Sequence, residues 1–402
     1  MSSFTRRAGR WAAALSAAAL VAACQASITV DAPAPAGARA AQVAEAGATV
    51  AWNKVARDMV VKYGTSAPAT IRVFAILSVA QYNALVDAEK STTGSPQSTE
   101  RGAVAGASVA VLKYIYPAEA TFLEGLVDQQ EASPASPAGG PKRFAAGESI
   151  GRAVAASVIA RASTDRFFEP FTGTVPLCAA CWKATPTPPA FATLGQAKPF
   201  FLASNSQFRP APHPAFGSPE YNASLAEVRQ IADTRTTQQD SIAKYWALPA
   251  GTVSAQGYWN VLASELALRY HLSERETAHR LALMNMAAYD AIVASHEAKY
   301  HYWLIRPSQA DPLIVRAIGL PSFPSYPSNH ATLAATAATV LGTFFPSERA
   351  WLEAHAQEGA DSRVYGGIHY RFDTEAGLVL GRKIGGWALA NDVVGHEPFV
   401  LK

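Results

Sequence analysis

Apolar positions along most of the chain recur every three to four residues, which is the spacing of amphipathic helices. The pattern begins near Val50 and is clearest in residues 71–90, 101–117 and 145–163. The strict alternation of apolar and polar residues that marks half-buried strands is almost missing. We therefore predict an all-α fold built from helical bundles.

The helical pattern is interrupted in the middle of the chain. Residues 167–220 are dense in proline and aromatic residues, and a structureless loop of that length is unusual inside a compact domain. The aromatic content favours an ordered segment that lies across the helices. Helical spacing returns at about residue 218 and continues to the end of the chain.

A helix predicted in the second half resembles one predicted in the first half. Residues 75–88 and 282–295 align at an offset of 207 positions (from 75 to 282), with identities at Ala80/Ala287, Tyr82/Tyr289, Ala84/Ala291 and Val86/Val293. This match suggests two related helical bundles, residues 50–166 and 221–402, joined by the proline-rich segment 167–220. The alternative is that any two alanine-rich amphipathic helices look alike.

Residues 1–23 have the features of an export signal. Arginines at positions 6, 7 and 10 precede an apolar run that is too short to span a membrane permanently. The four residues that end at Cys24 resemble a bacterial lipobox, in which the cysteine carries the lipid; the alternative is an ordinary secretory signal. Residues 24–49, rich in Ala and Pro, are expected to form a flexible tether. We expect a periplasmic or cell-surface lipoprotein that contacts the membrane only through its lipid anchor, or else a secreted protein.

The composition is that of a globular and nearly neutral protein. The 402 residues are 49% hydrophobic and 16% charged, enough for a large core. The formal charge of +3 comes entirely from the three arginines of the export signal, because the other 31 cations balance 31 anions. This balance does not favour binding to nucleic acid.

Apart from Cys24, the only cysteines are Cys178 and Cys181. Their spacing suits a redox pair, half of a zinc site or a small disulfide. Zinc would need more ligands, and the sequence has no second pair. Outside the cytoplasm a structural disulfide is the favoured interpretation.

Two cations stand seven positions apart in the segment 298–307. On an α-helix, seven residues make nearly two turns, so Lys299 and Arg306 would project from one face. Pro307 is expected to end that helix. Taken alone, this pattern is more typical of a solvated helix face than of a site.

A helix start and a second histidine segment follow. Residues 323–345 begin with prolines and run into an alanine-rich helix, which places Ser328, Asn329 and His330 at its N-terminus, a place suited to an oxyanion. Further on, Arg363 offers a planar fork for a tetrahedral anion, and His369 offers a nitrogen lone pair. Asp373 could orient the ring of His369 or cap the next helix, and capping is the favoured interpretation.

Three cations, a hydroxyl, a helix N-terminus and two histidines thus fall within about seventy residues, and no set of carboxylates or cysteines suggests a divalent metal site. This collection suits a tetrahedral oxyanion such as phosphate or vanadate. One histidine would attack or ligate the centre of the anion, and the other would transfer a proton.

The order and spacing of these residues resemble the three-part signature of the vanadium-dependent haloperoxidases and type 2 phosphatidic acid phosphatases. Residues 323–332 and 362–373 are similar to the corresponding segments of chloroperoxidases, and bacterial chloroperoxidase-like proteins are the branch that the chain resembles most. The resemblance covers roughly residues 50–395. It implies helical bundles of the haloperoxidase and acid phosphatase type.

The resemblance also implies roles for single residues. His369 would be the axial vanadium ligand, or the nucleophile of a phosphatase, and His330 the acid/base. The oxyanion would be held by Lys299, Arg306, Ser328, Asn329 and Arg363. In the peroxidase reading Lys299 also polarises the bound peroxide, and Phe323 and His296 stand in the halide or substrate pocket.

The sequence departs from the family pattern in three places, which involve four residues. Asn329 stands where glycine is usual, His296 stands where some relatives have tryptophan, and Leu248 and Pro249 stand where relatives often have an aspartate that pairs with the arginine matching Arg363.

The resemblance therefore implies a vanadate-dependent haloperoxidase that uses hydrogen peroxide and a halide. The alternative is an acid phosphatase of the same fold, which hydrolyses a phosphate ester through a phosphohistidine and needs no cofactor. A further alternative is an exported protein that binds an oxyanion without turnover, which Asn329 would favour.

Overall fold

The computed structural model describes residues 47–91, 97–132, 140–184, 188–393 and 397–401. These residues belong to one compact unit. The expected export signal, Cys24 and nearly all of the expected tether lie outside the described residues. The two segments that the sequence suggests as separate bundles, 50–166 and 221–402, share this unit.

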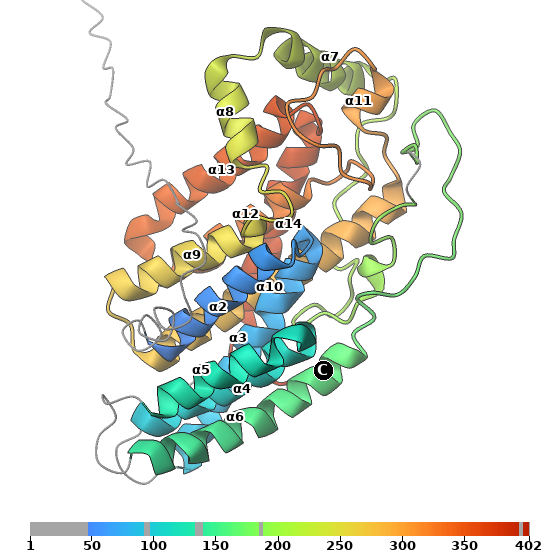
Figure 1. The fold of residues 1–402 in the computed structure, drawn as a ribbon. Helices are drawn as coiled ribbons and strands as arrows, with labels where there is room; N and C mark the ends of the chain where they lie inside the picture. The colour runs from blue at the N-terminus through green and yellow to red at the C-terminus, as the bar shows by residue number, and fades with distance from the viewer. Residues whose placement is uncertain (1–46, 92–96, 133–139, 185–187, 394–396, 402) are drawn as a thin grey trace, which may run out of the picture. The chain divides into compact units, whose positions relative to one another are not determined.

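The described residues are helical and contain no strand, so the predicted all-α fold is confirmed (Figure 1). The first half contains α2 (Ala48–Lys62), α3 (Ala67–Ser91), α4 (Gln97–Ile115), the 3₁₀ helix η1 (Pro117–Glu119), α5 (Ala120–Glu131) and α6 (Gly140–Ser163). The second half contains η2 (Leu194–Gln196), α7 (Pro219–Thr234), α8 (Thr237–Tyr245), α9 (Ser254–Arg269), α10 (Glu274–Tyr302), α11 (Pro307–Ala310), α12 (Asn329–Phe344), η3 (Pro346–Glu348), α13 (Arg349–Tyr365) and α14 (Arg371–Ala390).

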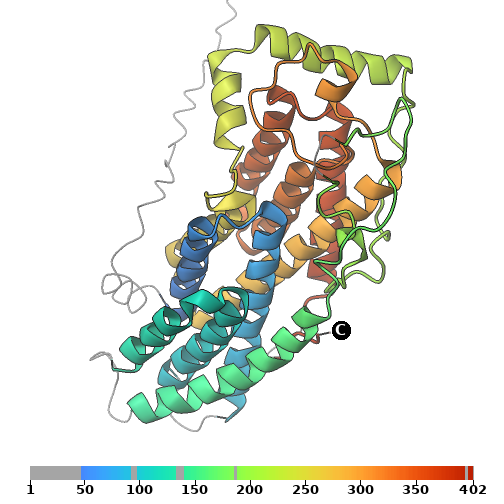
Figure 2. The same ribbon diagram turned by 45° about the vertical axis from the view of Figure 1, so that its right-hand side comes forward.

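Helices α3 and α10, which contain the two similar segments, pack against each other (Figures 1 and 2). Asn285 of α10 donates a hydrogen bond to the Ser78 hydroxyl of α3 at 2.9 Å, and these residues are themselves 207 positions apart. The same offset relates Asn53 of α2 to Asn260 of α9, and each donates to the carbonyl four residues earlier in its own helix. Positions related by the 207-residue offset thus make similar local contacts, and the relationship between the two helical segments stays a prediction.

Helix α3 lies in the core of the protein. It is long and apolar enough to cross a membrane by length and composition, but 94% of its most apolar window is buried inside the protein. That burial is what a core helix shows, and its apolar character is explained by packing.

The proline-rich segment is ordered where it is described and lies against α10. Phe167, Trp182 and Phe200 are buried. The carboxylate of Asp290 on α10 accepts hydrogen bonds from three consecutive backbone N–H groups, those of residues 200–202, at 2.6 to 3.0 Å. These bonds replace the backbone pairing that an irregular segment lacks, which explains how it remains ordered without secondary structure.

Close packing of α14 on α12 brings the beginnings of these two helices together. A Cβ atom on Gly381 would lie 2.2 Å from the carbonyl oxygen of Thr332, and one on Gly377 would lie 2.7 Å from that of Ser328. Only glycine permits this approach. As a result the backbone N–H of Ser328 reaches the carbonyl of Asp373 at 2.9 Å, and the segments that carry His330 and His369 become neighbours.

We expect Asp290→Ala to lower the free energy of unfolding by about 3 kcal/mol, because it leaves three buried N–H groups without an acceptor. Asp290→Asn should lower it less, since Asn83, the equivalent residue by the 207-residue offset, accepts the N–H of Phe399 through its amide oxygen. Urea denaturation measures both changes. Asp233→Ala, which removes an exposed ion pair with Arg229, is the control and should change stability by less than about 1 kcal/mol. Equal effects of Asp290→Ala and the control would contradict the assigned role.

Candidate anion-binding site

Lys299 and Arg306 do not lie on one helical face, so that prediction was wrong. Helix α10 ends at Tyr302, and Trp303 adopts a left-handed conformation with φ 53°. Arg306 is extended, with φ −79° and ψ 152°, and Pro307 begins the short helix α11. A residue that precedes proline disfavours the helical conformation, and proline fits the first turn of a helix. Both cations nevertheless lie at the same site, Lys299 in the last turn of α10 and Arg306 in the extended segment that follows it.

The extended segment before Arg306 is held by residues 178–183, which contain the two cysteines and are called the cysteine loop below. Cys178 and Cys181 form a disulfide, and the chain beside it pairs with residues 303–305 like a short antiparallel bridge. Two backbone hydrogen bonds make this contact, from the N–H of Trp182 to the carbonyl of Trp303 at 2.6 Å and from the N–H of Ile305 to the carbonyl of Ala180 at 2.8 Å.

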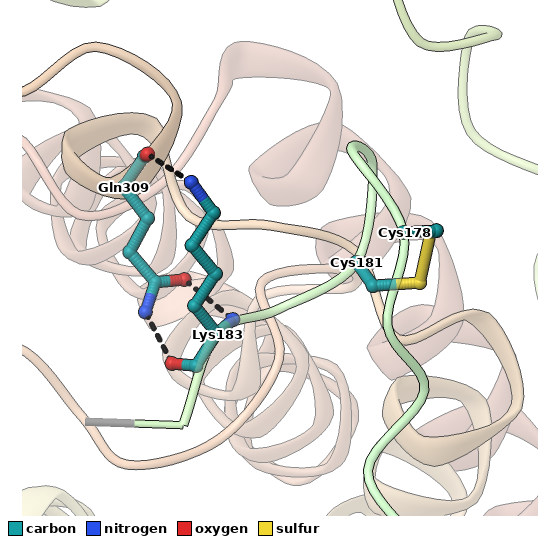
Figure 3. The surroundings of a disulfide bond; sticks show 4 residues. All are labelled: Cys178, Cys181, Lys183 and Gln309. Atoms are coloured by element: carbon teal, nitrogen blue, oxygen red, sulfur yellow. Dashed lines mark hydrogen bonds between the residues drawn. A yellow bond between two sulfur atoms is a disulfide. The ribbon is translucent and has the colours of Figure 1, made fainter. Parts of the chain in front are cut away.

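The contact continues on the other side of Arg306. Figure 3 shows Gln309 of α11 donating to the carbonyl of Lys183 and accepting from its backbone N–H. The same Gln309 side-chain oxygen also accepts the N–H of Arg306 at 3.3 Å. The cysteine loop therefore fixes the backbone of Arg306 from both sides.

The ammonium group of Lys299 is fully buried and already bonded. It donates to the backbone carbonyls of Pro324, Ser325 and Pro327 at 2.9, 2.7 and 2.5 Å. Burial, followed by the charge of Arg306, pushes the pKa of Lys299 well below its ordinary value. Three carbonyl acceptors nevertheless require three N–H donors, so we assign Lys299 as the charged form.

Arg306 is fully buried and has one guanidinium nitrogen without a partner. Its Nε donates to the carbonyl of Phe323 at 3.0 Å, and its Nη1 donates to the carbonyl of Ile368 and to Nε2 of His369, both at 2.9 Å. Its Nη2 is buried and makes no hydrogen bond. A buried donor without an acceptor is unfavourable, which points to a ligand atom beside it.

His369 is held in one tautomer by its two neighbours. Because the guanidinium of Arg306 can only donate, Nε2 of His369 must carry the lone pair. Its Nδ1 therefore carries the proton, which it donates to the carboxylate of Asp373 at 2.8 Å. Asp373 also accepts from the Ser325 hydroxyl and the Tyr370 backbone N–H, so it both orients the ring and caps α14. This tautomer is the one needed to ligate or attack an electrophilic centre.

The start of α12 is formed as the sequence predicts. Ser328 is the N-cap residue, and its hydroxyl accepts the N–H of Ala331. Asn329 is the first helical residue and has no positive φ, so its presence in place of glycine causes no backbone strain. Its side-chain oxygen accepts a hydrogen bond from Ser295 at 2.9 Å.

His330 presents a free ring nitrogen, because its Nε2 is buried and makes no hydrogen bond. Burial, and then the charge of Arg363, holds the pKa of His330 well below its ordinary value. The ring is therefore neutral near pH 7 and able to accept a proton.

Arg363 has no carboxylate within ion-pair distance among the described residues. Its Nε donates to the hydroxyl of Ser362 at 2.9 Å, and its Nη2 to the carbonyl of Ala243 at 3.4 Å. Leu248 and Pro249, which stand where relatives often have an aspartate, lie with Arg363 in the lining of one pocket. Burial, and then the charge of Arg306, lowers the pKa of Arg363 to about 9.

The side chains brought together here carry more positive than negative charge. Lys299, Arg306 and Arg363 are at most 3% exposed, and Asp373, with which Lys299 and Arg306 interact electrostatically, is fully buried as well. The pKa of His369 is lowered first by burial and then by Arg306, Lys299, Arg363 and His330, which places all of these groups within electrostatic reach of one ring. Buried cations without counter-charges are unfavourable, and a tetrahedral anion with two negative charges would neutralise the excess.

A pocket of about 390 Å³ opens beside this cluster. Its lining includes His330, Arg363, His369 and Asn329, together with apolar residues such as Phe323. Lys299, Arg306 and Ser328 are not among the residues that line it. His296 also lies outside the lining and packs behind Phe323, with ring centroids 5.4 Å apart.

Sequence reasoning missed Ser325 and Gln256, and of the two roles that Asp373 combines it favoured capping of the helix over orientation of the His369 ring. Ser325 supports the Asp373 carboxylate from a proline-rich loop, where one serine looks like any other. Gln256 lines the pocket from α9, far from every motif. The short spacing of His369 and Asp373 left the orienting role open in the sequence, but the contact is made across the start of α14, because His369 precedes the helix.

Comparisons with known proteins agree with this fold. Residues 348–394 match the family model of the VCPO second helical-bundle domain. A structure described as the first bacterial vanadium-dependent iodoperoxidase is similar with a TM-score of 0.72 and 22% sequence identity, over 86% of this chain and 96% of that one. The holo form of a bacterial vanadium-dependent chloroperoxidase is similar with a TM-score of 0.66 and 14% identity, over 80% of this chain and 91% of that one. No curated protein matches by sequence. These findings confirm, at the level of the fold, the resemblance predicted from the three-part motif.

We expect Asp373→Asn to weaken the binding of inorganic phosphate by roughly 10- to 100-fold, because an amide oxygen cannot replace the carboxylate as the shared acceptor for the ring N–H of His369, the Ser325 hydroxyl and the Tyr370 N–H. Isothermal titration calorimetry measures the affinity. Asp361→Asn is the matched control, since Asp361 pairs with Arg371 on the other side of the helix start and does not touch His369. Unchanged affinity in a folded Asp373→Asn variant would contradict the orienting role.

We expect sulfate to bind more tightly as the pH falls from about 8 to about 6. The pKa values of His330 and His369 are lowered by burial and by neighbouring cations, and a bound dianion raises them again, so binding takes up protons. Sulfate does not itself titrate in this range. Calorimetry in buffers of different ionisation enthalpy counts the protons, and His330→Ala should reduce the uptake. Proton release on binding would rule out this electrostatic account.

Proposed function

We propose that this protein, which has the all-α fold of the vanadium haloperoxidase-like superfamily, is an exported vanadate-dependent haloperoxidase-like enzyme that oxidises a halide with hydrogen peroxide. The observation that carries the proposal is the state of His369, whose Nε2 lone pair is directed by Asp373 and surrounded by three buried cations. The proposed export, with a lipid on Cys24 as the membrane contact, rests on residues 1–49 alone.

The described residues fit vanadate. Nε2 of His369 would ligate the metal, while Arg306 Nη2, which lacks a partner, and Arg363, which lacks a carboxylate, would hold oxygens together with the N-terminus of α12. Bound vanadate would supply an electrophilic centre that activates hydrogen peroxide towards a halide. Phosphate has the same shape and charge, so the same residues would also fit phosphate.

The residues around the site have separate tasks in this proposal. Arg306 Nη1 occupies the lone pair of His369 and must release it when the anion enters. His330 is neutral, so its free Nε2 would accept a proton from hydrogen peroxide in the pocket and return it to the departing hydroxide, which leaves as water. Lys299, which does not line the pocket, would supply positive charge that acts on His369. The apolar lining excludes water, which strengthens these electrostatic effects.

An acid phosphatase is the second candidate, and the bonding of Lys299 favours it. In a haloperoxidase the lysine is expected to polarise the peroxide directly, but here all three of its N–H groups are bonded to backbone carbonyls. A phosphatase requires only its charge. His369 would then attack phosphorus, and His330 would protonate the leaving group. Asn329, by contrast, gives little support to a site without turnover, because it leaves the helix start unstrained.

We expect the protein loaded with orthovanadate to brominate a dye in the presence of hydrogen peroxide and bromide, and His369→Ala to reduce the rate at least about 100-fold, because it removes the ligand nitrogen. The same preparation without vanadate is assayed with an aryl phosphate. Phosphate release that vanadate inhibits, with no bromination, would replace the first candidate with the second. If orthovanadate binds and neither reaction occurs, both enzymatic proposals fail. His355→Ala, which alters a half-buried histidine whose ring lies tilted against Trp351, is the matched control and should retain activity.

A further inference from the structure

The pocket is larger and more apolar than a small tetrahedral anion requires. Its volume of about 390 Å³ lies within the range of roughly 300–1,000 Å³ that is usual for organic ligand sites. Much of the lining comes from apolar side chains of separate segments, among them Ile71, Phe191, Leu248, Ile292, Leu320 and Leu333. The pocket therefore has room for an organic molecule next to the anion site.

Among the described residues, the side chains that line the pocket carry positive charge and no negative charge. No acidic side chain lines the pocket in the described part of the chain, and its polar members are Ser66, Gln256, Asn329, His330, Arg363 and His369. A cationic ligand would find no counter-charge there, and an anionic group would be drawn to Arg363. The rest of the pocket suits a neutral molecule.

Gln256 contributes a hydrogen-bond acceptor that the protein leaves unused. The residue is fully buried, and its Oε1 has no partner. Its Nε2 donates to Oδ1 of Asn285, which also accepts from Asn260 at 2.8 Å. A buried acceptor without a donor is unfavourable unless a ligand supplies one.

The orientation of this amide is fixed by its neighbours. The backbone carbonyl of Gln256 can only accept, so the Asn260 group that faces it at 2.9 Å must be the NH₂. That NH₂ also donates to Asn285, so the Asn285 atom it meets is the oxygen. Gln256 must then turn its own NH₂ towards this oxygen, which leaves Oε1 as the free acceptor.

We propose that this pocket binds a neutral organic substrate that has an apolar ring body and one O–H or N–H donor, as in a phenol, and that Gln256 Oε1 accepts that donor. As a statement about substrate, this rests on the proposed function, because electron-rich rings are what an oxidised halogen attacks. As a statement about binding, it stands on the pocket and on Gln256 alone.

The test compares 2-naphthol with 2-methoxynaphthalene, whose methyl group removes the donor and keeps the ring. Titration calorimetry without peroxide should show 2-naphthol binding about tenfold more tightly to the wild-type protein, the effect of one neutral buried hydrogen bond. Gln256→Met should bring the two affinities within about twofold of each other by weakening 2-naphthol alone. Ser78→Ala is the matched control, because it removes a bond at the far side of the Asn285 network and should leave the preference intact.

A second variant keeps the test valid if Gln256→Met does not fold. Leu320→Trp, on a loop that lines the pocket, should weaken both ligands at least about tenfold by filling the space. Equal affinities for the two ligands in the wild-type protein, or a preference that survives Gln256→Met, would overturn the proposal. The bromination assay is read separately: binding that depends on Gln256 without bromination defeats only the proposed function, whereas bromination without such binding defeats only this inference.

Discussion

The architecture of the site depends on how three buried cations are stabilised in the interior of the protein. Lys299, Arg306 and Arg363 are buried around one histidine, and Asp373 is the carboxylate in direct contact with that histidine. Backbone carbonyls stabilise these cations by accepting hydrogen bonds, three from Lys299 and two from Arg306. Carbonyl dipoles solvate a cation without neutralising it, so the site keeps its attraction for an anion while its donors stay in place.

This arrangement explains why irregular segments surround the site. Carbonyls inside helices are bonded to their own helix, whereas those of the loop 323–327 and of Ile368 are free to face the cations. The cysteine loop then fixes the backbone of Arg306, and the glycines of α14 allow the loop and the second histidine segment to meet. The helices fix where the surrounding segments lie, and the loops between the helices supply the carbonyl groups that accept hydrogen bonds from the cations.

The two segments that contain the similar helices, residues 50–166 and 221–402, contribute unequally to the site. Equivalent positions of α3 and α10 meet in the core, and equivalent residues, Asn83 and Asp290, each receive an irregular segment, the chain around Phe399 and residues 200–202. The histidines and cations of the site all come from the second segment. The first segment contributes Ser66 and Ile71 to the apolar side of the pocket, where an organic ligand rather than the anion would lie.

The sequence by itself determined the helical class, the start of α12 at Asn329 and the set of side chains suited to an oxyanion. Those features depend on local periodicity, on capping and on residue chemistry, which are all present in short stretches of chain. It could not place Arg306, because the end of α10 is set by the left-handed Trp303 and by pairing with a loop more than 120 residues away. Nor could it show that Lys299 is bonded to three carbonyls, that Asp373 fixes the tautomer of His369, or that Gln256 keeps a free oxygen. These depend on which distant groups meet, and only the tertiary structure decides that.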